Sequence, residues 1–310
     1  MTRLNTLIFI LVFLSGCMPK PSLTSIPQID RRSKIPTSAI KMTPLMDRHP
    51  PQVQSDEFEP AIPLPGEVNT AGGEDSPFVT ADGEWLYFFF TPDINIPAEK
   101  QILDGVSGIY RARSIDGEWK DVEKVILQDP GKLALDGCAF VQGNVMWFCS
   151  VREGFEGINW FTASNNSGKW RGWQLAAFNP DYKVGELHIT SQGDVLYFAS
   201  DRLGGKGGLD IWASKWVDGS WQEPINVVAV NTQEDEILPA LNPQNDELWF
   251  TRNYSIWRSK KAAEGWQPPE LIISSLAGEP SIDPKGNVYF VHHFVDQVMI
   301  EADIYVAFRK

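Results

Sequence analysis

The chain has 310 residues, of which 43% are hydrophobic and 12% aromatic, enough for one large core. Its 12 Trp, 25 Gly and 22 Pro favour many short strands and tight turns over long helices. The net charge is −13, residues 1–55 are net positive, and the part beyond residue 55 is therefore strongly acidic, which makes it repel phosphate backbones. The composition therefore argues against nucleic acid as a partner.

The N-terminus is predicted to be a targeting segment. Arg3 precedes an apolar run at residues 4–14, which has the length of a signal-peptide core and is too short to span a bilayer. The run ends in Leu14-Ser15-Gly16-Cys17, which resembles a bacterial lipobox. The resemblance implies a signal peptide at residues 1–16 and acyl chains, palmitate among them, on Cys17. The alternative is an ordinary secretory signal with a chance cysteine.

Residues 17–55 are predicted to form a disordered tether. The segment after Cys17 contains seven Pro, lacks the alternation of strands and cannot bury enough apolar surface to fold alone. Its first residue, Met18, differs from the Asp of lipoproteins that stay in the inner membrane. The resemblance therefore implies a lipid anchor in the outer membrane, with the protein facing the periplasm.

Beyond residue 55 the sequence repeats. An aromatic strand core recurs five times, at residues 85–88, 145–148, 195–198, 247–250 and 287–290. A turn containing Gly and Trp recurs four times, at residues 117–119, 168–170, 219–221 and 265–266. Each unit therefore holds four strands in about 50 residues, the size of one β-propeller blade.

The two ends of the repeat region predict how the ring of blades closes. The last unit stops after the strand at 303–308, and residues 59–70 resemble the fourth strand of the third unit at 223–232. The N-terminal segment is therefore predicted to complete the last blade, which removes an exposed sheet edge. The predicted fold is all-β, a single five-bladed β-propeller at residues 56–310 whose last blade is closed by an N-terminal strand.

Residues 197–253 carry motifs of a known family. They contain Ser200-Asp201-Arg202, a glycine-rich stretch at 204–208 and Leu209-Asp210-Ile211-Trp212. These motifs resemble the WD-repeat-like, TolB-type propeller repeats of bacterial envelope proteins. The resemblance covers residues 59–310, with a divergent second unit. It implies a non-catalytic platform that binds an envelope protein or a glycan.

Cys138 and Cys149 lie on either side of Gly143-Asn144, a favoured two-residue hairpin turn. Pairing outward from this turn places the two cysteines opposite each other, at the wider, hydrogen-bonded kind of position. The periplasm permits disulfides, so the pair is a disulfide candidate. Two buried thiols are the alternative.

An acidic residue stands at or just before the start of each unit's innermost strand. These residues are Asp75, Asp136, Glu186, Glu236 and Glu279. Innermost strands start at the same mouth of a propeller channel, so the carboxylates are predicted to form a rough ring. In a structural interpretation, each acid caps a neighbouring blade or pairs with a basic residue that ends a second strand, such as Arg152, Arg202 or Arg252.

Two functional interpretations of the ring stay open beside the structural one. Clustered carboxylates raise one another's pKa or recruit a cation, so the ring, with His188, could hold a polar ligand or Ca²⁺. Five-bladed propellers also serve arabinanases, β-xylosidases and invertases. Asp75, Asp136 and Glu186 are similar to the acids of those enzymes in order and placement, and hydrolysis needs one carboxyl as acid and one as base or nucleophile.

His188 shares a strand face with Glu186, because alternate side chains point the same way. Such a pair could titrate near neutral pH, and a hydrogen-bonded core histidine is the alternative. Trp173 and Trp216 do not belong to the repeat, so they are candidates for a contact with a sugar or protein.

Several common catalytic patterns are missing from the sequence. It holds neither a Gly-X-Ser-X-Gly elbow nor a His-Glu-X-X-His zinc motif, and the glycines at 204–208 lack the spacing of a phosphate loop. The sequence thus predicts an outer-membrane lipoprotein that binds a protein or glycan without catalysis, cofactor or nucleotide. A glycoside hydrolase is the alternative.

Overall fold

The computed structural model describes residues 29–178 and 187–310. Antiparallel strands dominate these ranges, and the helices described there are two single turns, η1 (Arg31–Lys34) and α1 (Ala98–Gln101). Neither is long and apolar enough to cross a membrane.

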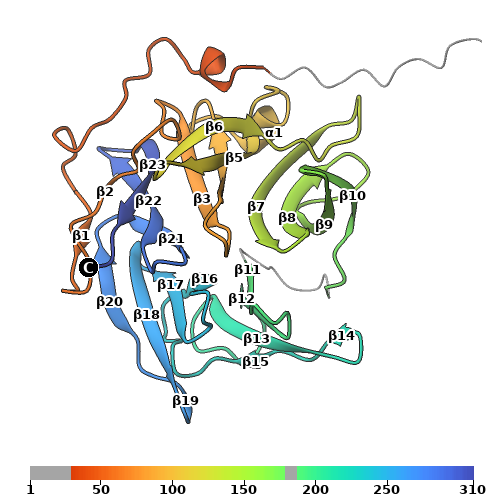
Figure 1. The fold of residues 1–310 in the computed structure, drawn as a ribbon, viewed down its shortest axis with the longest axis vertical. Helices are drawn as coiled ribbons and strands as arrows, with labels where there is room; N and C mark the ends of the chain where they lie inside the picture. The colour runs from red at the N-terminus through yellow and green to blue at the C-terminus, as the bar shows by residue number, and fades with distance from the viewer. Residues whose placement is uncertain (1–28, 179–186) are drawn as a thin grey trace, which may run out of the picture.

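The strands form up-and-down sheets arranged around a common centre (Figure 1). One sheet consists of β7 (Ala134–Gln142), β8 (Val145–Arg152), β9 (Asn159–Asn166) and β10 (Lys169–Leu175). The next consists of β11 (Leu187–Ile189), β12 (Val195–Ser200), β13 (Asp210–Val217), β14 (Ser220–Trp221) and β15 (Ile225–Asn226). The third consists of β16 (Ile237–Leu241), β17 (Glu247–Arg252), β18 (Ser255–Ala262), β19 (Gly265–Trp266), β20 (Glu270–Ser274) and, on its outer edge, β1 (Gln52–Val53).

The remaining strands form two more up-and-down units, which a single parallel bridge between Ala302 and Gly73 joins into one large sheet. The first unit holds β3 (Gly73–Val79), β4 (Trp85–Thr91), β5 (Gly108–Ile115) and β6 (Glu118–Lys124). The other holds β21 (Ala277–Ile282), β22 (Val288–Val295), β23 (Met299–Ala307) and β2 (Ile62–Pro63). Repeated antiparallel sheets around one centre are the architecture of a β-propeller. The chain is therefore a β-propeller.

The N-terminal strand β2 lies where the repeats predict it. Ile62 pairs with Val306 and Pro63 with Tyr305, so β2 continues the unit of β21, β22 and β23 on its outer side. Proline fits this place because an outer strand has one row of amides that needs no partner.

Aromatic side chains at repeated positions join neighbouring sheets. The indole of Trp170 donates a hydrogen bond to the Tyr87 hydroxyl at 3.2 Å, and that of Trp266 donates to Tyr197 at 3.3 Å. Trp119 packs edge-on against Tyr289, with ring centroids 6.0 Å apart. Three of the four turn tryptophans thus pack against the strand tyrosine of the preceding unit, whereas Trp221 contacts Trp216.

Residues 29–55, which we call the N-terminal strap, run along the outside of the sheets (Figure 1). The strap ends in β1, which pairs with β20. Before that, Lys41 forms ion pairs with Glu301 and Asp303, and the Asp47 carboxylate lies 2.8 Å from Nε2 of His292. Over these residues the chain makes specific contacts, which differs from the disordered tether predicted from composition. The reason is that β23 presents two buried carboxyls, those of Glu301 and Asp303, which pair with Lys41, and β22 presents the buried imidazole of His292, which pairs with Asp47.

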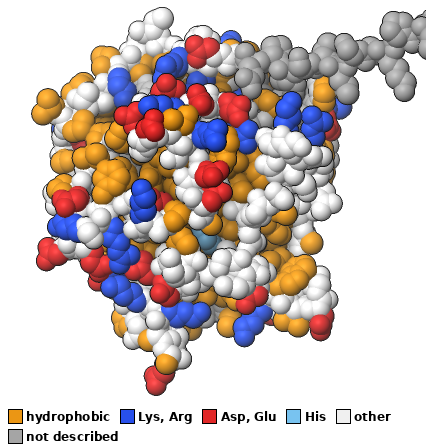
Figure 2. Space-filling model, in the orientation of Figure 1, with side chains coloured by type: hydrophobic (Ala, Val, Ile, Leu, Met, Phe, Trp, Pro, Cys, Tyr) orange, Lys and Arg blue, Asp and Glu red, His pale blue; other side chains and the backbone are white. Residues whose placement is uncertain are grey.

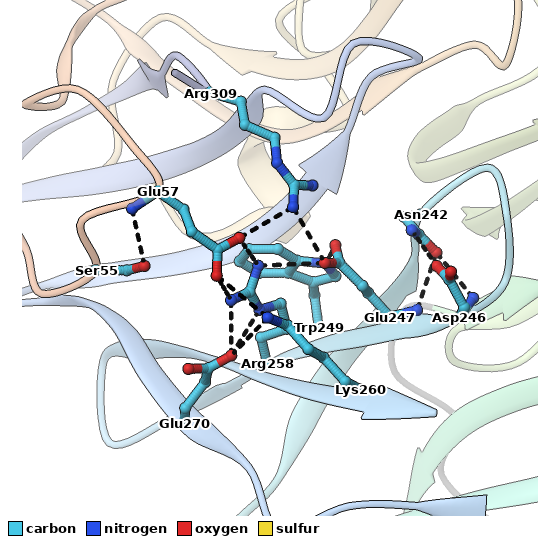
Figure 3. A network of polar contacts seen from close by, with 10 residues as sticks. All are labelled: Ser55, Glu57, Asn242, Asp246, Glu247, Trp249, Arg258, Lys260, Glu270 and Arg309. Carbon is cyan, nitrogen blue, oxygen red and sulfur yellow. Dashed lines mark hydrogen bonds and ion pairs between the residues drawn. The ribbon is translucent and has the colours of Figure 1, made fainter. Parts of the chain in front are cut away.

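A second network fixes the segment that leads into β2 (Figure 3). The Arg258 side chain on β18 is fully buried and contacts three carboxylates, those of Glu57 at 2.6 Å, Glu270 at 2.6 Å and Glu247 at 3.2 Å. Arg309 also reaches Glu57, at 2.9 Å. The N-terminal and C-terminal segments are therefore tied to the same sheet.

Candidate functional site

The five innermost strands meet at one small cavity, which we call the channel cavity. It has a volume of about 40 Å³, and β3, β7, β11, β16 and β21 all contribute to its wall. Its wall includes Ser76, Phe78, Cys138, His188, Leu238 and Glu279.

Four of the innermost strands carry a bulge at equivalent positions of this wall. The bulged residues are Ser76, Cys138, Leu238 and Glu279, whose φ angles lie between 51° and 58°. An extra residue bends a strand and re-aims the side chains around it. The bulges therefore decide which acids of the predicted ring face the channel.

Two acids of the predicted ring are committed to buried ion pairs. The Asp136 carboxylate lies 2.7 Å from the Arg152 guanidinium and also accepts a hydrogen bond from the Ser150 hydroxyl. Glu236 pairs with Arg252 at 2.6 Å. Both acids are buried, and both arginines end the second strand of their own sheet. These contacts agree with the structural interpretation of the ring.

In the first unit the equivalent acid is Glu74 and not Asp75, the residue predicted from the sequence. Glu74 is fully buried, and its partner is Arg31 of the strap at 2.9 Å. Burial raises the pKa of Glu74, and the guanidinium opposes that rise. The sequence contains a signal for this equivalence, because a threonine stands four residues before each of the two acids. In the structure the Thr70 hydroxyl donates to Glu74, and the Thr232 hydroxyl donates to Glu236.

Asp75 and Glu279 form a separate pair beside the channel cavity. Both are half-buried, and the backbone N–H of Ser76 donates to Glu279 at 2.6 Å. Burial, as the larger cause, and repulsion from Glu279, as the smaller one, raise the pKa of Asp75 well above its usual range. Burial likewise raises the pKa of Glu279. These two carboxyls thus keep their protons to higher pH than isolated ones.

His188 lines the channel among aromatic rings rather than beside a described acid. Its ring centroid lies 4.8 Å from that of Phe140 and 6.2 Å from that of Phe78. Burial lowers the pKa of His188 to about 3, so the imidazole is neutral at neutral pH. The predicted partner Glu186 lies outside the described residues, as does Cys17.

Cys138 and Cys149 are joined by a disulfide, with 5.4 Å between their Cα atoms. The predicted hairpin turn at Gly143-Asn144 is present, because Gln142 pairs with Val145. The predicted register is off by one residue, however, since Cys149 pairs with Gly137. The bulge at Cys138 causes the shift.

The two non-repeating tryptophans have different surroundings. The Trp173 indole donates to Asp129 at 3.2 Å, and its ring lies beneath the Arg152 guanidinium, so it serves the fold. Trp216 is 41% exposed and contacts Trp221 edge-on.

Within the described residues, no group of three or more His, Cys, Asp and Glu side chains is arranged to hold a metal ion. Because Asp136 and Glu236 have arginine partners, Asp75 and Glu279 are the described acids of the predicted ring that remain for a cation.

Comparison with known proteins gives a likeness of fold and no family. No protein-family profile matches the chain, and no curated protein matches it. Among solved structures, an exo-β-1,3-galactanase from Phanerochaete chrysosporium is 11% identical, with 84% of this chain and 64% of that one covered and a TM-score of 0.49. An arabinanase from Bacillus subtilis is 13% identical, with 77% and 95% covered and a TM-score of 0.44. A putative TolB from Agrobacterium tumefaciens is 14% identical, with 78% and 92% covered and a TM-score of 0.41.

Proposed function

We propose that the chain is a non-catalytic binding module built on a five-bladed β-propeller whose last blade is completed by β2. The pairing of β2 with β23 supports this ring, as does the contact of Trp119 with Tyr289, which joins the first and last units as other pairs join consecutive ones. The channel cavity, with walls from five innermost strands, supports the number of blades.

One observation carries the non-catalytic part of the proposal. The acids that the repeat places at the strand starts serve the fold, because Glu74, Asp136 and Glu236 all lie in buried ion pairs with arginine. The cavity beside them, about 40 Å³, is far below the roughly 300–1,000 Å³ of ordinary ligand sites. A sugar ring has no room there.

The test is a hydrolysis assay on arabinan, xylan and β-1,3-galactan oligosaccharides, with product release followed by chromatography. We expect the wild-type protein to release no more product than buffer does. Release that disappears in the Asp75→Asn/Glu279→Gln double variant would overturn the non-catalytic proposal.

A glycoside hydrolase is the second candidate, and the Asp75–Glu279 pair is the observation that favours it. Two neighbouring carboxyls with raised pKa values resemble an acid and its partner base. The predicted set of Asp75, Asp136 and Glu186 is less suitable for hydrolysis, because the Asp136 carboxylate is already ion-paired with Arg152. The double variant above tests this candidate directly.

We also propose that residues 1–16 are a signal peptide and that Cys17 carries the acyl chains of an outer-membrane lipoprotein facing the periplasm. The lipobox resemblance supports this. Metabolic labelling with a palmitate analogue, followed by membrane fractionation, tests it. Labelled wild-type protein and unlabelled Cys17→Ser protein are expected, and equal labelling of both would sink the idea.

A further inference from the structure

A larger cavity, which we call the turn-end cavity, opens at the other end of the innermost strands. It has a volume of about 480 Å³, within the range of small-ligand sites. Its floor includes Phe78 and His188, which also line the channel cavity. Its rim comes from the turns that follow β3, β7, β11 and β16.

The rim departs from the repeat at Trp85. The other units carry Val145, Val195, Glu247 and Asn287 at the position of this tryptophan, which is the first residue of the aromatic strand core. Structural residues of a repeat tend to recur, as the turn tryptophans do, so a large ring found in one unit needs another reason. The Trp85 ring is half-buried and lines the cavity.

Trp85 is held in place by a neighbour whose charge is neutralised. The Arg111 guanidinium lies 4.3 Å from the Trp85 ring centroid. Its Nε donates to Glu123 at 2.7 Å and its Nη2 donates to the Gly168 carbonyl at 3.0 Å. Arg111 therefore stiffens the aromatic wall without presenting an unpaired positive charge to a ligand.

Two amides on the rim are also fixed. Gln142 donates to the Thr190 carbonyl at 2.7 Å, and Asn245 donates to the Ser191 hydroxyl at 2.6 Å. Each of these bonds links two different units, so the amides are ordered before a ligand arrives. Ordered polar groups beside an aromatic ring cost a ligand little conformational entropy.

We propose that the turn-end cavity binds a neutral oligosaccharide, with one sugar ring packed against Trp85 and sugar hydroxyls facing the rim amides. An aromatic ring offers an apolar surface to the C–H face of a sugar, and amides both donate to and accept from hydroxyls. The paired Arg111 and the acidic net charge disfavour a phosphorylated or carboxylated ligand. This inference rests on the proposed binding function and names its ligand class.

The test is calorimetric titration of the folded protein with four neutral probes, namely cellotetraose, xylotetraose, laminaritetraose and chitotetraose. We expect saturable binding of at least one probe, weakened about tenfold or more in Trp85→Ala, which corresponds to the loss of one ring contact. Gln142→Ala provides a second variant with a smaller loss in volume. Tyr254→Ala is the matched control, because Tyr254 is an aromatic residue with 60% exposure outside the lining of the turn-end cavity, and the affinity of this variant should equal that of the wild type.

Three outcomes are decisive. Failure of all four probes to bind at about 10 mM would overturn the inference. Binding that survives Trp85→Ala and Gln142→Ala but is lost in Asp75→Asn/Glu279→Gln would also overturn it, and would leave the proposed binding function standing at a site outside the turn-end cavity. Probe hydrolysis during the titration would instead contradict the non-catalytic proposal, while dependence on Trp85 would still uphold the site.

Discussion

The ring of Phe58 lies edge-on against the indole of Trp249, with centroids 6.0 Å apart. Phe58 precedes β2, and Trp249 stands at the centre of β17, so the contact joins segments from nearly opposite ends of the folded chain. Both side chains are buried. Phe58 thus stands where the turn tryptophans stand in the other units, although its unit has no Gly-Trp turn.

Phe58→Ala should therefore destabilise the fold by about 3–5 kcal/mol, the usual cost of removing a buried phenylalanine. Denaturant unfolding followed by tryptophan fluorescence measures this change. Leu203→Ala is the control, because Leu203 is 99% exposed and should change stability by less than about 0.5 kcal/mol. Equal midpoints for the two variants would mean that the N-terminal segment does not complete a blade.

Arg258→Ala should destabilise by about 3–5 kcal/mol, because it leaves the carboxylates of Glu57, Glu247 and Glu270 without their shared cation. Lys260 contacts Glu57 and Glu270 as well, but its side chain is 51% exposed. Lys260→Ala should therefore cost less than about 1 kcal/mol. Thermal and urea unfolding of both variants provide the comparison, and similar losses would contradict the network in Figure 3.

Arg31→Ala tests whether the N-terminal strap belongs to the fold. Removing the guanidinium leaves Glu74 buried without its ion-pair partner, which should cost about 3–5 kcal/mol. Amide hydrogen exchange should rise across residues 29–55 at the same time. Arg32→Ala is the matched control, since Arg32 is exposed and no ion pair is recorded for it among the described residues. Unchanged exchange in Arg31→Ala would show that the strap is held by other contacts.

His188 should make stability fall in acid. Its pKa is about 3 in the folded protein and about 6.5 in an unfolded chain, so below pH 6.5 the unfolded state binds the extra proton. The stability that the neutral His188 contributes is fully present above pH 6.5 and is lost progressively toward pH 3. Over that range the free energy of unfolding changes by at most about 1.4 kcal/mol per pH unit because of this group. In His188→Gln the slope between pH 6 and 4 should become smaller by up to this amount, with a remainder from His292 and His293, whose pKa values burial also lowers, whereas the exposed His49→Gln control keeps the full slope. Urea midpoints measured across this range check the sign.

The architecture was largely predictable from the sequence, because the spacing of the repeated motifs gives the length of each four-stranded unit. The aromatic cores at 85–88 and 287–290 fall in β4 and at the start of β22, and the segment at 59–70 contains β2, which pairs with the strand predicted for it. Patterns of this kind depend on local residue order alone.

The site was less predictable, because bulges and distant partners decide it. A one-residue bulge at Cys138 shifts the cysteine register. A similar bulge follows Asp75, and the neighbouring acids Glu74 and Asp75 have different roles. Arg31 could not be assigned to Glu74 from local order, since the acid's partner comes from the strap rather than from the end of β4. Trp85 is visible in the sequence as a departure from the repeat, but its cavity depends on residues from five strand units.

The pairing of β2 with β23 also bears on how the protein is made. Translation produces Ile62 long before Val306, yet each is the other's neighbour in the finished sheet. A nascent chain must therefore keep β2 uncommitted until β23 has left the ribosome. Until then the edge of β23 that β2 covers has no partner strand, so this sheet is finished only after the two segments meet.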